Sequence, residues 1–120
     1  MRAYNNWYLS IFDKLNNMFK NVPKVTSCEF KRLNNECECK IIIIFDDILS
    51  FNVIFSGDTL KIFKVCEHEN TLDTMLHETE VLSMNAISLS DSDDVISMYV
   101  NIILWTIILH DKEFNDRKIS

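Results

Sequence analysis

Two short runs of cysteine and histidine hold the residues with the greatest potential for chemistry. They are Cys37-Glu38-Cys39 and Cys66-Glu67-His68, which together offer four thiol and imidazole groups at two short spacings. Residues two apart on a strand share a face, so each pair could point at one metal ion. Structural zinc sites usually place two to four residues between paired ligands, however, and cysteine is often simply buried. Cys39 fits the core side of a strand pattern, so we predict no metal ligands and no cofactor.

Catalytic groupings are equally weak in this sequence. His77 and His110 have no nucleophile and acid at a recognisable spacing, and His110 is explained by a favourable position near a helix C-terminus. There is no Gly-x-Ser-x-Gly, no glycine-rich phosphate loop and no His-Glu-x-x-His. We therefore predict a protein with no catalytic residues, which is not an enzyme. Ser88 and Ser90 each have an aspartate three residues later, a weak pattern that leaves phosphorylation open.

Composition narrows the class of protein. The chain has 120 residues, of which 48% are hydrophobic, and a net charge of −6. This length suits one domain that buries roughly two-thirds of its unfolded surface. The acidic balance and the lack of a basic run argue against nucleic acid. The N-terminus lacks the apolar stretch of a signal peptide, and four cysteines without one suggest free thiols. We expect an intracellular protein, nuclear or cytoplasmic.

Hydrophobic spacing predicts a helix followed by a sheet. Apolar residues recur at helical spacing over 4–19, and Pro23 ends that helix. From residue 25 the period becomes two, which predicts a four-stranded antiparallel meander over 25–65. An Asn34-Asn35 turn would set Glu29 opposite Lys40 and Lys31 opposite Glu38. A turn at 46–48 keeps Leu49, Phe51, Val53 and Phe55 on the core face. A type II′ turn at Gly57-Asp58 pairs Phe55 with Leu60 and Val53 with Ile62.

The other face of this sheet carries apolar residues as well. They are Ile42, Ile44, Ile54 and Phe63, on neighbouring strands. Such a patch is either a partner-binding surface or is covered by another segment of the chain. We take these four residues as the candidate partner-binding site.

After the meander the pattern becomes helical again. Residues 71–82 predict a short helix, 84–89 an extended segment, and the run Ser90-Asp-Ser-Asp-Asp94 caps a last helix over 95–109. The acidic run lacks the glycine and glutamate of a calcium loop. The last helix is apolar all round, with Val95, Met98, Tyr99, Ile102, Trp105 and Leu109 on one side. The opposite side, Ile103, Leu104, Ile107 and Ile108, is our candidate dimer or partner interface.

The domain organisation follows from this pattern. We predict one globular α+β domain over 1–110, with the long C-terminal helix packed on one face of the sheet, and a flexible tail over 111–120. The last helix is too short and too interrupted by polar residues for a membrane span, so we expect no membrane association.

The order of elements resembles RWD-type domains of kinetochore proteins, most closely the monopolin-type globular domain. The resemblance rests on the strand Leu60-Lys-Ile-Phe-Lys-Val65, the leucine-rich segment Thr71–Leu82, the apolar-acidic segment Ala86-Ile-Ser-Leu-Ser-Asp91 and the aromatic Tyr99 in the last helix. It covers residues 5–109 and has no diagnostic motif. The loop over 66–70 lacks the proline and glycine common in that family. The resemblance implies a non-enzymatic adaptor that receives peptides from kinetochore or nucleolar partners.

Three functions therefore stay open. The first is a protein-protein interaction adaptor that binds a protein or peptide through the sheet patch or the last helix. The second is a small acidic homodimeric chaperone similar to those of bacterial secretion systems. The third is a virus-encoded antagonist of a host factor. The Asn- and Ile-rich composition suggests an A+T-rich genome, which favours several parasitic or viral lineages.

Overall fold

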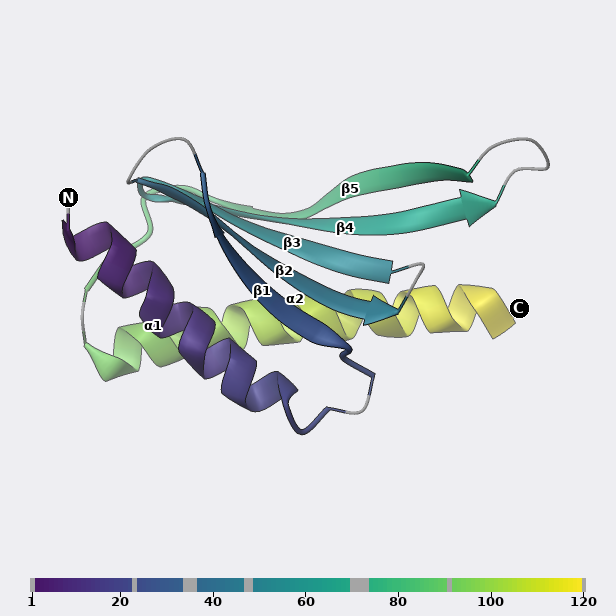
Figure 1. The fold of residues 1–120 in the computed structure, drawn as a ribbon, viewed down its shortest axis with the longest axis horizontal. Coiled ribbons are helices and arrows are strands. Elements are labelled where there is room, and N and C mark those ends of the chain that lie inside the picture. The colour runs from purple at the N-terminus through teal and green to yellow at the C-terminus, as the bar shows by residue number, and fades with distance from the viewer. Residues whose placement is uncertain are drawn as a thin grey trace.

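The computed structural model describes residues 2–22, 24–33, 37–46, 49–69, 74–90 and 92–119, and it shows an α+β fold. Two helices flank five strands in chain order (Figure 1). The elements are α1 (Arg2–Phe19), β1 (Ser27–Arg32), β2 (Glu38–Asp46), β3 (Leu49–Ser56), β4 (Thr59–Glu69), β5 (Thr74–Met84) and α2 (Asp93–Ile119).

The molecule has two layers, a sheet and a pair of helices. The sheet has the order β1-β2-β3-β4-β5, and every neighbouring pair is antiparallel. Both helices lie on the same side of it and cross each other there (Figure 1). We call the covered side the inner face and the opposite side the outer sheet face. Within the described part of the chain both helices lie on one face, and no second layer covers the outer sheet face.

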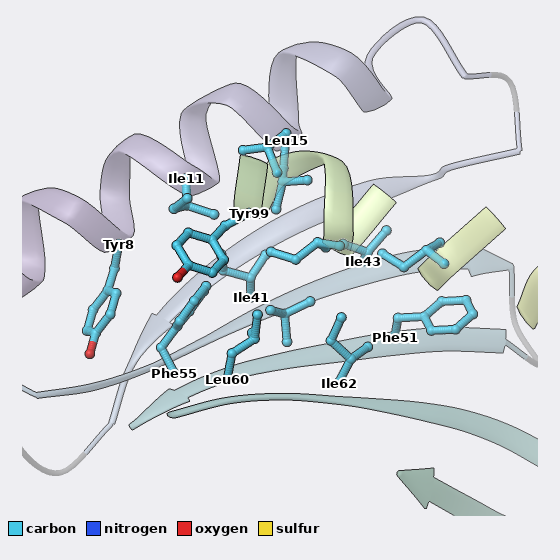
Figure 2. Packing of buried hydrophobic residues seen from close by; sticks show 14 of the residues in the cluster. Tyr8, Ile11, Leu15, Ile41, Ile43, Phe51, Phe55, Leu60, Ile62 and Tyr99 are labelled. Atoms are coloured by element: carbon cyan, nitrogen blue, oxygen red, sulfur yellow. The ribbon is translucent and has the colours of Figure 1, made fainter. Parts of the chain in front are cut away.

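The core fills the space between the inner face and the helices (Figure 2). Trp7, Tyr8, Ile11 and Leu15 of α1 follow helical spacing and are almost completely buried. Tyr8 stacks on Phe55 with ring centroids 5.1 Å apart. The strands and α2 complete the core with Cys39, Ile41, Ile43, Phe51, Val53, Phe55, Leu60, Ile62, Tyr99, Ile103 and Ile107, all at most 3% exposed.

The first hairpin keeps the predicted faces but not the predicted register. The structure sets Glu29 opposite Ile42 and Lys31 opposite Lys40, two residues away from the charge-paired register. The amide of Leu33 donates to the carbonyl of Glu38, so the connection is longer than the predicted two-residue turn. The turn itself, Asn34-Asn35, lies outside the described residues. A shift of two preserves side-chain parity, so both registers keep the same residues on the inner face, and two exposed ion pairs of small energy are too weak to fix the predicted one.

The connection between β3 and β4 agrees with the predicted pairing, whereas the turn predicted at 46–48 lies partly outside the described residues, and Asp46 pairs with Leu49. Phe55 lies opposite Leu60 and Val53 opposite Ile62, and Gly57 has a φ of +58°. Glycine accepts this conformation without the cost that a Cβ atom brings. A bulge lies between Ile44 and Asp46, yet the parity of β3 is as expected, with its odd-numbered residues from 49 to 55 buried.

The segment predicted as a short helix is instead the strand β5. Residues 74–84 pair with β4 from Glu69 to Leu60, which makes five strands where the sequence predicted four. Without β5, the long strand β4 would be left as an open edge with unpaired backbone groups. The leucine spacing over 72–82 is only roughly helical, whereas the ladder gives β4 a hydrogen-bonded partner on its second side and makes β5 the edge strand. Residues 70–73 lie outside the described part.

The last helix begins as predicted and continues further. Asp93 and Asp94 lie in its first turn, and the carbonyl of Ser92 accepts the first helical hydrogen bond from the amide of Ile96. The helix runs to Ile119, so most of the predicted tail over 111–120 is helical, and Ser120 lies outside the described residues. The stretch Asp93–Asp111, with a mean hydropathy of 1.3, is long and apolar enough to cross a membrane by length and composition alone. The core helix of a soluble protein meets the same test.

Candidate functional site

Cys39 and Cys66, one from each of the two short runs that were considered as a metal site, lie far apart. Cys39 lies opposite Phe55 on β3 and Cys66 lies opposite Leu49, six residues further along the same strand. At about 3.3 Å per residue this separation is roughly 20 Å, far beyond a shared coordination sphere. The described residues contain no group of three or more His, Cys, Asp or Glu that could hold a metal ion. The side chain of His68 lies outside the described part.

The buried thiols are also poorly suited to chemistry. Burial raises the pKa of the Cys39 thiol to about 12. Burial, and next the nearby charge of Glu29, raise the pKa of the Cys28 thiol to about 11. The thiolate is the form that attacks electrophiles and binds metals, so both cysteines remain inert thiols at neutral pH.

The four residues of the predicted partner-binding site lie together on the outer sheet face. Ile42 and Phe63 flank Asn52 in one cross-strand row, and Ile44 and Ile54 lie in the rows on either side. All four are half-buried. Val65, which the sequence analysis did not include, lies across Ser50 from Ile44 and adds a second β4 residue to the patch beside Phe63. The patch therefore spans the three central strands and has no helix above it (Figure 1).

Lysines concentrate at one end of this patch. Lys31, Lys40 and Lys61 lie in the same cross-strand row as Ile54, with Lys31 directly opposite Lys40. Lys61 forms an ion pair with Glu80 at 3.7 Å. Lys31 and Lys40 form no ion pair within the described part of the chain. Like charges directly opposite each other on neighbouring strands are destabilising, so this row is an electrostatic conflict on an acidic protein.

A second apolar surface lies on α2, on the side away from the core. It comprises Met98, Ile102, Trp105, Ile108 and Leu109, and we call it the α2 stripe. Trp105 is 68% exposed and Leu109 is 57% exposed, although both are large apolar side chains. An open groove of about 650 Å³ runs along it, lined by Asp94, Ser97, Met98, Asn101, Ile102, Trp105 and Thr106.

The predicted dimer or partner interface on α2 needs correction. Ile103 and Ile107 are fully buried in the core and have no surface with which to contact a partner. Leu104 is half-buried, and only Ile108 of the predicted four is exposed. Tyr99, predicted on the opposite side to Ile103, also packs in the core.

The true solvent side of α2 had a signal in the sequence. At about 100° per residue, Asp94 and Asn101 lie within about 40° of Trp105 when the helix is viewed along its axis. Both are exposed, and they mark the face that points away from the sheet. Polar residues thus located the uncovered side, whereas the apolar residues, present all round the helix, did not.

The segment before α2 is held by two aromatic side chains. The Trp7 indole Nε1 donates to the carbonyl of Ser90 at 2.9 Å, and the Tyr99 hydroxyl accepts from the amide of Ser88 at 2.7 Å. The Ser90 hydroxyl accepts from the amide of Ser92, as expected at the start of a helix. Ser88 and Ser90 are exposed, and whether either is phosphorylated stays an open question.

Comparison with protein-family models, with curated proteins and with solved structures gives no match to this chain.

Proposed function

We propose that this protein is a non-enzymatic adaptor that binds another protein through its outer sheet face. The observation that carries the proposal is the apolar patch of Ile42, Ile44, Ile54, Phe63 and Val65 on a face without a second layer. The exposed area of five half-buried apolar residues on neighbouring strands adds nothing to the stability of the free domain. A partner that covers this area would remove it from water, which contributes favourable free energy to binding.

The charges beside the patch indicate the chemistry of the partner. Lys31 and Lys40 repel each other across β1 and β2, at the end of the patch that Ile54 occupies. A carboxylate supplied by the partner would relieve this repulsion and add complementary charge at the rim. We therefore infer a partner segment that combines apolar anchors with acidic residues.

The order of helix, meander and long terminal helix supports an RWD-like adaptor with kinetochore or other chromosome-associated partners. The strand β5 stands where that resemblance would have a short helix.

The test is quantitative mass spectrometry of the proteins that co-purify with the tagged full chain from its native cell. Three variants change the surface: Ile44→Lys, Phe63→Lys and Lys40→Glu. Lysine is chosen at position 63 because Glu80 lies opposite and can pair with it. Asn17→Lys, an exposed change on α1, is the matched control.

We expect one set of partners that all three surface variants lose by at least about tenfold and the control retains. Kinetochore proteins in that set would support the RWD-like assignment. Partners that bind the surface variants as well as they bind wild type would overturn the proposed surface. A single unfolded client still bound by the variants would favour the chaperone reading instead.

A further inference from the structure

The α2 stripe is the strongest feature that the proposed function does not use. It lies on the helix layer, whereas the proposed adaptor surface lies on the far side of the sheet (Figure 1). Trp105 points directly away from the core face of α2, since Ile103 and Ile107 lie about half a turn from it around the axis. Four large apolar side chains of the stripe, Met98, Trp105, Ile108 and Leu109, are 46% to 68% exposed.

We propose that the α2 stripe is a homodimer interface, in which α2 pairs antiparallel with α2 of a second copy of this chain. The inference is independent of the proposed adaptor function. A helix with two apolar faces needs both of them covered. The described part of the chain covers one face of α2, and a second copy would cover the other.

The exposed apolar area of the stripe supplies roughly two-thirds of what one partner of a small specific interface buries. If a large apolar side chain offers about 150 to 250 Å², the four exposed fractions amount to roughly 400 Å². The polar residues that flank the groove raise the total toward the roughly 600 Å² per partner at which specific pairwise interfaces begin. Tryptophan and methionine are enriched at the centres of interfaces and charged residues are depleted there. Asp94 is the one charged residue among those that line the groove.

Charge decides the direction of pairing. The rise of 1.5 Å per residue and a two-fold axis at the middle of the stripe would place the two Asp94 carboxylates roughly 30 Å apart in an antiparallel pair. This separation exceeds the Debye length of about 8 Å in physiological salt. A parallel pair would bring the same carboxylates, and the two helix N-termini, side by side. The antiparallel arrangement also places opposite ends of the two helix dipoles together.

Shape is self-complementary in the same arrangement. The groove has the small side chains of Ser97 and Asn101 toward its beginning, and the bulky Trp105 and Leu109 follow further along the helix. With a two-fold axis at the middle of the stripe, reversing one copy places Trp105 of each chain near Asn101 of the other, and Leu109 near Met98. Each copy therefore contributes both the projecting side chains and the hollow that receives them.

The first measurement is the molar mass of the pure full chain by sedimentation equilibrium from about 1 to 100 μM. We expect a mass of twice 14.1 kDa at the upper concentrations. Trp105→Glu should be monomeric throughout, with unchanged circular dichroism because the side chain lies outside the core. Met18→Glu, which changes an exposed apolar residue on α1, is the matched control and should dimerise like wild type.

Two outcomes would overturn the proposal: a wild-type chain that stays a monomer across this range, or a Trp105→Glu variant that still dimerises. Tryptophan emission gives a separate readout, because Trp7 is 1% exposed and Trp105 is 68% exposed. Dilution should shift the emission of wild type to longer wavelength as Trp105 becomes solvated. A concentration-independent spectrum in a dimeric sample would place the interface elsewhere.

Cysteine cross-linking tests the direction. In an antiparallel pair, Met98→Cys on one chain lies near Leu109→Cys on the other, so a mixture of the two variants should form a mixed disulfide. Peptide mass spectrometry distinguishes it from disulfides of the native cysteines. Efficient cross-linking of Met98→Cys to itself would show a parallel pair and overturn the arrangement proposed here.

Discussion

Four consecutive isoleucines on β2 point alternately to the two faces of the sheet, so they allow the faces to be compared within one stretch of chain. Ile41 and Ile43 are completely buried, whereas Ile42 and Ile44 are half-buried on the outer sheet face. The residues have the same chemistry, the same strand and nearly the same neighbours along the chain. The difference arises because α1 and α2 cover one face only (Figure 1). Hydrophobic residue type therefore does not define the core here, and the position of the helix layer does.

Truncating one isoleucine on each face to alanine gives the largest expected difference in the free energy of unfolding. Ile43→Ala should lower the free energy of unfolding by about 2 to 5 kcal/mol, because it leaves a cavity beneath the helices. Ile44→Ala should cost about 1 kcal/mol or less, since that side chain is already in contact with water. Urea denaturation at constant m-value measures both. Equal losses would show that the outer sheet face is covered in solution and that the two faces do not differ.

A polar group of the inner face should have a smaller but clear effect. The Tyr8 hydroxyl is completely buried and lies 2.9 Å from the carbonyl oxygen of Cys37 and 3.0 Å from that of Gly57. Tyr8→Phe removes the shared donor at the end of two strands and should cost about 1 to 2 kcal/mol. Ser10→Ala removes an exposed hydroxyl from the same helix and should cost much less. If thermal denaturation showed the two variants to be equally stable, the hydrogen bonds of Tyr8 would make no net contribution to the free energy of folding.

The smallest predicted effect is a pH-dependent loss of folding stability that appears only in alkaline solution. Burial raises the pKa of Cys39 from 9.0 to about 12, so the unfolded chain releases this proton at lower pH than the native protein does. The contribution to stability is complete below pH 9 and is lost as the pH rises toward 12. Urea midpoints at pH 7, 9 and 10.5 should fall only over the last step. Cys39→Ala should reduce that fall, and an identical fall in the variant would contradict the inner-face burial of the thiol.

Most of the inner face could be predicted from the sequence because it depends on simple periodicity. The period of two over residues 25–65 and the position of Gly57 were enough for the strand faces and for the pairing of β3 with β4. These features are local, since a single glycine with a φ of +58° fixes the hairpin.

The errors have a shared physical cause, which is competition between weak local signals and nonlocal packing. Opposite charges predicted one register for the first hairpin, but exposed ion pairs contribute little free energy and do not fix the register. A rough helical pattern over 71–82 gave way to the backbone hydrogen bonds of β4. On α2 both sides are apolar, so the apolar residues alone could not show that Ile103 and Ile107 lie inside and Trp105 outside. The sign lay in the exposed polar residues Asp94 and Asn101, which the prediction did not use.

The contact between α1 and the start of α2 has a consequence for synthesis of the chain. Trp7 bonds to Ser90 and Lys14 to Ser97, so these partners are separated by 83 residues. All strands pair with their neighbours in sequence and can assemble as they leave the ribosome. At roughly 5 to 20 residues per second, α1 waits for several seconds before α2 exists. During that interval its apolar side is a natural binding site for chaperones, and slower translation would prolong that exposure.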